Sequence, residues 1–129
     1  MIIKTAAELA AMQEIGKICA VTLKKMGEAL APGMTTKELD QYGAELFASF
    51  GAVSAPITCY QFPGHNCISV NDTVAHGIPN DYVIQAGDIV NIDVSAMKNG
   101  YFGDNSASFA VPPIKHIHEK LLVAGRETL

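Results

Sequence analysis

Two aspartates and a nearby histidine are the residues of this sequence whose types and spacing suit chemistry. Asp93 and Asp104 lie in two β-like runs joined by Asn99-Gly100, and His76 lies in a Gly/Pro turn ahead of them. Carboxylates bind divalent cations, and two ions about 3.5–4 Å apart can share a bridging carboxylate. The alternative is a solvated outer face, on which Asp and Ser are ordinary residues.

The predicted hairpin places both aspartates on one face. Asn99-Gly100 is typical of a two-residue type I′ turn, so the residues that flank it pair with each other. Counting outward from that pair sets Ser95 opposite Asp104, and Asp93 becomes a diagonal neighbour on the same face, within about 7–8 Å. Two like charges at that separation repel each other unless a cation lies between them. The opposite face of the first strand is apolar and should meet the core: Val90, Ile92, Val94 and Ala96.

The remaining histidines and cysteines offer weaker signals. His76 alone in a turn also suits a hydrogen-bonded surface group. His116 and His118 form an H-x-H pattern at the start of a predicted helix, where residues two apart do not share a face, so we exclude them as a metal pair. The cysteines show no C-x-x-C spacing, which argues against a thiolate zinc site. Cys67 is predicted to be a small apolar strand residue.

Residues 1–51 are predicted to form two helices that serve as scaffold. Thr5 with Glu8 and Thr35 with Glu38 match the capping-box pattern, and Pro32-Gly33 ends the first helix. Each helix carries an apolar stripe at three- and four-residue steps. The first stripe is Leu9, Met12, Ile15, Cys19, Leu23, Met26 and Leu30, and the second is Leu39, Tyr42, Leu46, Phe47 and Phe50.

Residues 52–111 are predicted to be short strands broken by Pro and Gly, with the two aspartates on their last hairpin. Pro112-Pro113 ends this β region, because proline cannot sit inside a paired strand. Residues 112–129 read as a helix without a terminator near Leu129, and we expect it to be a partial element. The fold class is therefore α/β of the α+β kind, in one domain over residues 1–129.

Composition narrows the classes of partner. The 129 residues leave room for one core, with 49% hydrophobic and 17% charged residues. The net charge of −4, without a Lys/Arg cluster beyond Lys24-Lys25, argues against direct nucleic-acid binding. We expect no membrane association, because neither a signal-peptide pattern nor about 18 uninterrupted apolar residues is present. Three cysteines without a disulfide pattern favour the cytoplasm.

With these residues identified, the chain resembles the methionine aminopeptidases of the short bacterial type. Five segments match in the family's order, and the resemblance extends to about Phe109. The segments are PGMTTKELD at 32–40, CISVN at 67–71, AHGIP at 75–79, GDIVNIDV at 87–94 and GYFGD at 100–104.

The resemblance implies the N-terminal half of a "pita-bread" aminopeptidase fold, in which two helices precede curved antiparallel strands and a partial third helix. It implies a site for two divalent metal ions (Co, Mn, Fe or Zn), with Asp93 chelating one ion and Asp104 bridging both. His76 would bind the substrate and stabilise the tetrahedral intermediate, as a catalytic residue. Phe62 and Cys67 would line the pocket for the methionine side chain.

The chain departs from the family in the residues that complete the metal site. The family adds one histidine and two glutamates from a C-terminal half, and neither His116 nor His118 matches that histidine's motif. Asn105 stands where the family commonly has Thr. We therefore expect removal of N-terminal methionine from nascent proteins only together with the other half, and an inactive chain alone.

Two other readings remain open. The first is a truncated, non-catalytic remnant or binding module with weak affinity for divalent metals. The second is a proline-specific or creatinase-like relative on the same fold, which the HGIP and FPG segments at 76–79 and 62–64 disfavour. The expected partners are the N-terminal peptides of nascent proteins, the ribosome, and a second copy of the chain through an exposed sheet edge.

Overall fold

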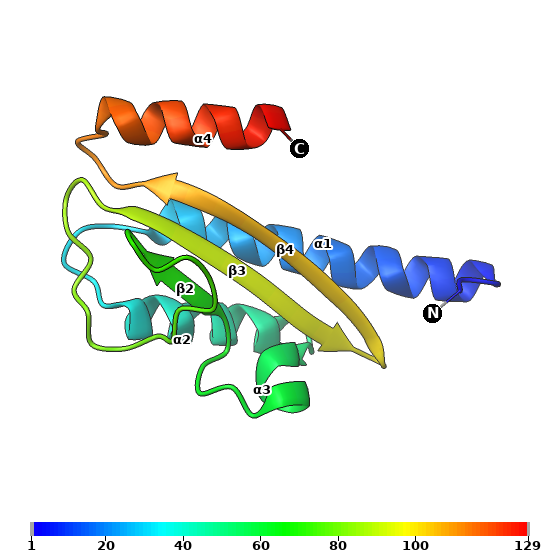
Figure 1. The fold of residues 1–129 in the computed structure, drawn as a ribbon. Helices are drawn as coiled ribbons and strands as arrows, with labels where there is room; N and C mark the ends of the chain where they lie inside the picture. Colours follow the sequence, from blue (N-terminus) through cyan, green and yellow to red (C-terminus); the bar gives the residue numbers. More distant parts are fainter. Residues whose placement is uncertain (1, 129) are drawn as a thin grey trace.

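A long β-hairpin forms the middle of the structure (Figure 1). The computed structural model describes residues 2–128. Strand β3 (Ile89–Lys98) pairs along its whole length with β4 (Tyr101–Ala110). Its other side pairs with β2 (Cys67–Val70) near one end and with β1 (Val53–Ser54) near the other. All three pairings are antiparallel, so β3 is the strand on which the sheet is built.

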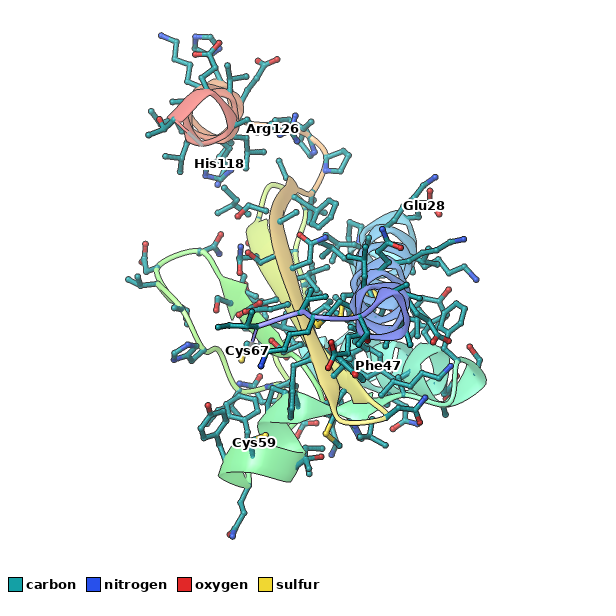
Figure 2. All side chains as sticks on the ribbon, turned by 90° about the vertical axis from the view of Figure 1, so that its right-hand side faces the viewer. Glu28, Phe47, Cys59, Cys67, His118 and Arg126 are labelled. Carbon is teal, nitrogen blue, oxygen red and sulfur yellow. The ribbon has the colours of Figure 1, made fainter. Side chains whose placement is uncertain are left out.

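The two long helices cover one side of this sheet. Helix α1 (Ala6–Ala29) and helix α2 (Thr36–Ser49) both begin with the predicted capping boxes. Figure 2 shows both helices on one side of the strands, with Phe47 on that side and Cys67 on the other. The sequence prediction of two scaffold helices is confirmed.

The predicted strand register is also confirmed. Asn99 and Gly100 both have positive φ, 53° and 81°, as a type I′ turn requires, and Ser95 lies opposite Asp104. The apolar face of β3 is fully buried against the helices. Its four residues, Val90, Ile92, Val94 and Ala96, are each 0% exposed. The other face of β3, with Asp93, therefore looks away from the core.

The segment predicted to be all strands contains a helix, which corrects that expectation. Residues 55–60 form α3 (Ala55–Tyr60). Ser54 caps it by accepting a hydrogen bond of 3.3 Å from the Ile57 N–H, and a proline lies in its first turn. Six residues are too few for an apolar stripe to show in the sequence, so only the cap and the proline could have indicated this helix.

Helix α4 (His116–Thr128) follows the sheet, as the helical spacing predicted. It has no buried residue, and both figures show it apart from α1 and α2. The helix was predicted to continue to Leu129, and that residue lies outside the described part of the chain. Among residues 2–128, none of the helices is long and apolar enough to cross a bilayer.

Candidate metal centre

The two aspartates lie together on the face of the hairpin that points away from the helices. The Ser95 hydroxyl donates a hydrogen bond of 2.9 Å to Oδ1 of Asp104 across the strands. Asp93 is opposite Cys67 on β2 and opposite Ser106 on β4. The carboxylate of Asp93 is thus partly enclosed in the middle of the sheet, whereas Asp104 is exposed on the edge strand.

The electrostatics of this face favour a bound cation. Burial, the charge of Asp104 and a hydrogen bond with Asp104 together raise the pKa of Asp93 to about 6, although the charge of His76 lowers it. Burial, followed by the charges of Asp93, Asp40 and Asp104, raises the pKa of the Cys67 thiol to about 11. Cys67 therefore stays a neutral thiol, and the negative charge lies on the carboxylates.

His76 lies in the loop after β2, and the contacts of the next residue with β2 hold this part of the loop in place. Its backbone has a positive φ of 53°. The next residue, Gly77, donates its N–H to the buried Ser69 hydroxyl at 3.0 Å and accepts the Ile68 N–H at 2.9 Å. A side chain on Gly77 would collide with the Ile68 carbonyl. The imidazole borders a cleft of about 620 Å³, and its charge acts on Asp93.

Asp88 fixes the loop that carries His76, a role that the sequence did not predict. Its carboxylate accepts hydrogen bonds from the Asn71 amide at 2.9 Å, the Tyr82 hydroxyl at 3.0 Å and the Gln85 N–H at 2.8 Å. These bonds hold the pKa of Asp88 below its usual range, although its burial acts the other way. The local sequence indicates only a turn here, because the two side-chain donors lie 6 and 17 residues away.

A second cavity, of about 470 Å³, lies beside Asp104. Helix α3 and the start of β4 form it, and Figure 2 shows Cys59 on that helix. Its lining residues are Ala55, Pro56, Cys59, Tyr60, Ser95, Phe102, Gly103 and Asp104. Cys59, Tyr60 and Phe102 were not predicted as site residues, because the helix that carries the first two was predicted to be strand.

The two residues predicted to line a methionine pocket lie outside that lining. Phe62 is half-buried after α3, and its N–H donates to the Pro56 carbonyl at 3.3 Å. Cys67 is buried on β2 beside Asp93. The buried Asp40 carboxylate of α2 accepts a hydrogen bond of 2.7 Å from the Asn66 N–H. This bond holds the segment between Phe62 and Cys67 against α2. The role of Phe62 and Cys67 in substrate binding stays a prediction.

Comparison with known proteins identifies the architecture that holds these residues. Residues 10–129 match metallopeptidase family M24. The chain belongs to this family.

Within family M24, the chain is similar to methionine aminopeptidases. It is 58% identical over 111 residues to the methionine aminopeptidase of Staphylococcus epidermidis, covering 86% of this chain and 44% of that protein. It is 39% identical over 129 residues to methionine aminopeptidase 1 of Bacillus subtilis, covering 100% and 52%. The chain thus spans about half the length of the curated relatives it matches.

A solved structure supports the predicted fold. The methionine aminopeptidase of Thermotoga maritima superposes with a TM-score of 0.93 at 31% identity, over 100% of this chain and 52% of that chain. The predicted α/β pita-bread fold is confirmed. Within this fold, β2 carries Cys67, β3 carries Asp93 and β4 carries Asp104.

The M24 chain offers part of a metal coordination sphere. The two carboxylates are hard oxygen ligands of the kind that divalent cations bind, and their mutual repulsion is relieved by a cation. Among residues 2–128 there is no group of three or more His, Cys, Asp or Glu side chains that could hold an ion. His116 and His118 lie on α4 and add nothing to such a group. The pair therefore fits a divalent ion but leaves most of its coordination positions open.

Proposed function

We propose that this chain contributes Asp93 and Asp104 to the dinuclear metal site of a methionine aminopeptidase, which removes the N-terminal methionine of nascent proteins. The observation that carries the proposal is the pair of carboxylates on one face of the β3–β4 hairpin, with Asp104 oriented by the Ser95 hydroxyl. The similarity to methionine aminopeptidases over most of this chain supports the reaction class.

The chain's own residues have distinct tasks in this proposal. Asp93 and Asp104 would hold the ions, whose chemistry when bound would be to polarise the substrate carbonyl and activate water. The neighbouring Gly77, which donates a hydrogen bond to Ser69 of β2, fixes the position of His76. His76 donates a hydrogen bond to the substrate oxygen on which charge develops. The cavity beside Asp104 receives the methionine side chain, since Phe102 and Pro56 give it an apolar lining.

A second candidate is a non-catalytic binding module with weak affinity for divalent metals. The open coordination of the carboxylate pair favours it, because two oxygen ligands on one face do not enclose an ion. Both candidates share one expectation: the chain alone has no aminopeptidase activity. They differ once the missing ligands are supplied.

The experiment is reconstitution of the site. The chain is mixed with the C-terminal half of the Staphylococcus epidermidis methionine aminopeptidase and Mn²⁺, and release of Met from a Met-Ala-Ser peptide is measured. We expect turnover with the wild-type chain and a loss of at least about 100-fold with Asp104→Asn, since even indirect partners of a metal ligand contribute 10–100-fold. The matched control Asp72→Asn removes an exposed turn carboxylate and should keep the activity.

Turnover by Asp104→Asn at the wild-type rate would show that Asp104 holds no ion. A wild-type chain that binds the added half but releases no methionine would favour the binding module.

A further inference from the structure

Two buried polar side chains lie one turn apart at the start of helix α2. Thr36 is 2% exposed and Asp40 is 6% exposed. Residues four apart share a face of a helix, so both side chains point to the same side of α2. Burial of a polar side chain costs free energy unless hydrogen bonds compensate it. The partners of these two residues therefore show what this face of α2 holds.

Asp40 holds the segment that leads into β2. Its two carboxylate oxygens accept the His65 N–H at 3.1 and 3.0 Å, and one of them also accepts the Asn66 N–H at 2.7 Å and the Asn66 side-chain amide at 3.0 Å. Among residues 2–128, no lysine, arginine or histidine forms a salt bridge with Asp40. The buried carboxylate therefore directs its hydrogen bonds to two consecutive residues just ahead of Cys67.

Thr36 holds the segment that follows His76. Its hydroxyl accepts the Asn80 N–H at 2.9 Å and donates to the Asn80 carbonyl at 3.0 Å. The Thr36 N–H donates to the Tyr82 carbonyl at 3.1 Å, so the loop between β2 and β3 is attached to the start of α2 (Figure 1). This attachment begins four residues after His76.

The two held segments pack against each other. The ring of Pro79, three residues after His76, lies directly over Gly64: a Cβ added to Gly64 would lie 2.7 Å from Cδ and 2.9 Å from Cγ of this proline. Through this contact, the segment held by Asp40 supports the loop that carries His76. The bonds of Thr36 keep the same part of the loop on α2.

We propose that Thr36 and Asp40 are positioning residues for His76. By holding residues 64–66 and 79–80 against each other, they fix the loop that presents the imidazole. The inference rests on the proposed function for the task of this imidazole, a hydrogen bond to the substrate oxygen on which charge develops. Such a donor must be placed closely, since a misplacement of about 1 Å can lower a rate by about 100-fold even when its cause is far from the chemistry.

The first experiment observes the imidazole of His76 in the chain by itself. Thr36→Val and Asp40→Asn keep the size of the side chains and remove hydrogen bonds from this face of α2. The ring signals of His76 in proton–carbon correlation spectra are assigned with His76→Gln. The matched control is Thr22→Val, because the buried Thr22 hydroxyl has no hydrogen-bond partner among the described residues. We expect the His76 signals to move by more than their linewidth in both α2 variants and to stay in place in the control. An equal movement in all three variants would contradict the proposal.

Gly64→Ala tests the contact itself, because it leaves Thr36 and Asp40 unchanged while its Cβ displaces Pro79. It should also move the His76 signals, and it gives the answer if Asp40→Asn does not fold. A role in stability alone would leave the His76 signals in place in every folded variant. Unmoved signals in Gly64→Ala, or in an α2 variant that circular dichroism shows to be folded, would overturn the proposal.

The second experiment measures kcat and KM for release of Met from a Met-Ala-Ser peptide by the Mn²⁺ enzyme reconstituted with the C-terminal half of the Staphylococcus epidermidis protein. Loss of an interaction made only in the transition state lowers kcat and leaves KM unchanged, so we expect Asp40→Asn and Thr36→Val to lower kcat by about 10–100-fold. A rise in KM at the wild-type kcat would contradict the positioning role.

The two experiments separate this proposal from the proposed function. A wild-type chain without turnover would contradict the proposed function, and the spectra would still decide whether Thr36 and Asp40 position His76. Moved His76 signals together with an unchanged kcat would support the positioning role and contradict the task proposed for the imidazole.

Discussion

The hydroxyl of Ser95 lies 2.9 Å from Oδ1 of Asp104 and donates a hydrogen bond to it across the hairpin. This bond orients the exposed carboxylate of the edge strand toward the half-buried Asp93. In the proposed metal site, Ser95 would be a positioning residue, because a hydrogen-bonded partner fixes the direction of a metal ligand.

Replacing Ser95 by Ala should therefore weaken metal binding without unfolding the hairpin. We expect Mn²⁺ affinity in the reconstituted enzyme to fall by about 10–100-fold, the usual effect of removing such a partner. Isothermal titration with Mn²⁺ measures it. Ser106→Ala is the matched control, since it removes a hydroxyl from the same face opposite Asp93. Equal affinities in the two variants would contradict the positioning role.

The stability of the metal-free chain should fall as pH rises from about 4 to 6. Burial and the neighbouring Asp104 raise the pKa of Asp93 from 3.8 to about 6, so the native state binds more protons than the unfolded state in this window. The stabilising proton is fully bound below the unfolded pKa and is lost as pH passes the folded pKa. Urea unfolding with chelator from pH 4 to 7 should show this slope in the wild type relative to Asp93→Asn. Parallel curves would contradict it.

Gly77→Ala should destabilise the chain by displacing the His76 loop. The added Cβ meets the Ile68 carbonyl, and overpacking of this kind costs about 1–3 kcal/mol. Gly16→Ala is the control of opposite sign. Its Cβ meets nothing within 4 Å on α1, so the free energy of unfolding should rise by about 0.5–1 kcal/mol. Urea unfolding measures both, and an unchanged stability of Gly77→Ala would refute the tight approach.

Lys98 should contribute more to the free energy of unfolding than Lys24, which also forms a salt bridge. Its ammonium lies 2.7 Å from Glu14 on α1 and 2.8 Å from the Phe50 carbonyl, which ties the hairpin tip to both long helices. Lys98→Met should lower the free energy of unfolding by about 1–2 kcal/mol. The Lys24–Glu28 pair is exposed, so Lys24→Met should change it by less than about 0.5 kcal/mol. Equal losses would show that the tie contributes nothing.

Much of this fold follows from local rules that the sequence carries. Asn99-Gly100 sets the hairpin register, and that register alone brings Asp93 and Asp104 to one face. The capping boxes at Thr5 and Thr35 begin the helices where local hydrogen bonding dictates. These features depend on residues within a few positions of one another, and the sequence predicted them.

What the sequence did not predict depends on contacts between distant residues. The cavity beside Asp104 forms only when α3 folds against the start of β4. Cys59 and Phe102, which are far apart in the sequence, both line it. Asp40 holds the Asn66 N–H from 26 residues away, and nothing in its local sequence indicates that partner. Short helices and buried carboxylate anchors therefore escaped prediction, whereas strand register did not.

The most direct test of the central claim is a titration of residues 1–129 with Mn²⁺, comparing the wild type with Asp93→Asn and Asp104→Asn. Two carboxylates on one open face should bind the ion weakly, with a Kd above roughly 10⁻⁴ M, as in the weakest oxygen-ligand sites. Both variants should lose this binding. Tight binding of two ions by the wild type, or weak binding that survives in both variants, would contradict the account.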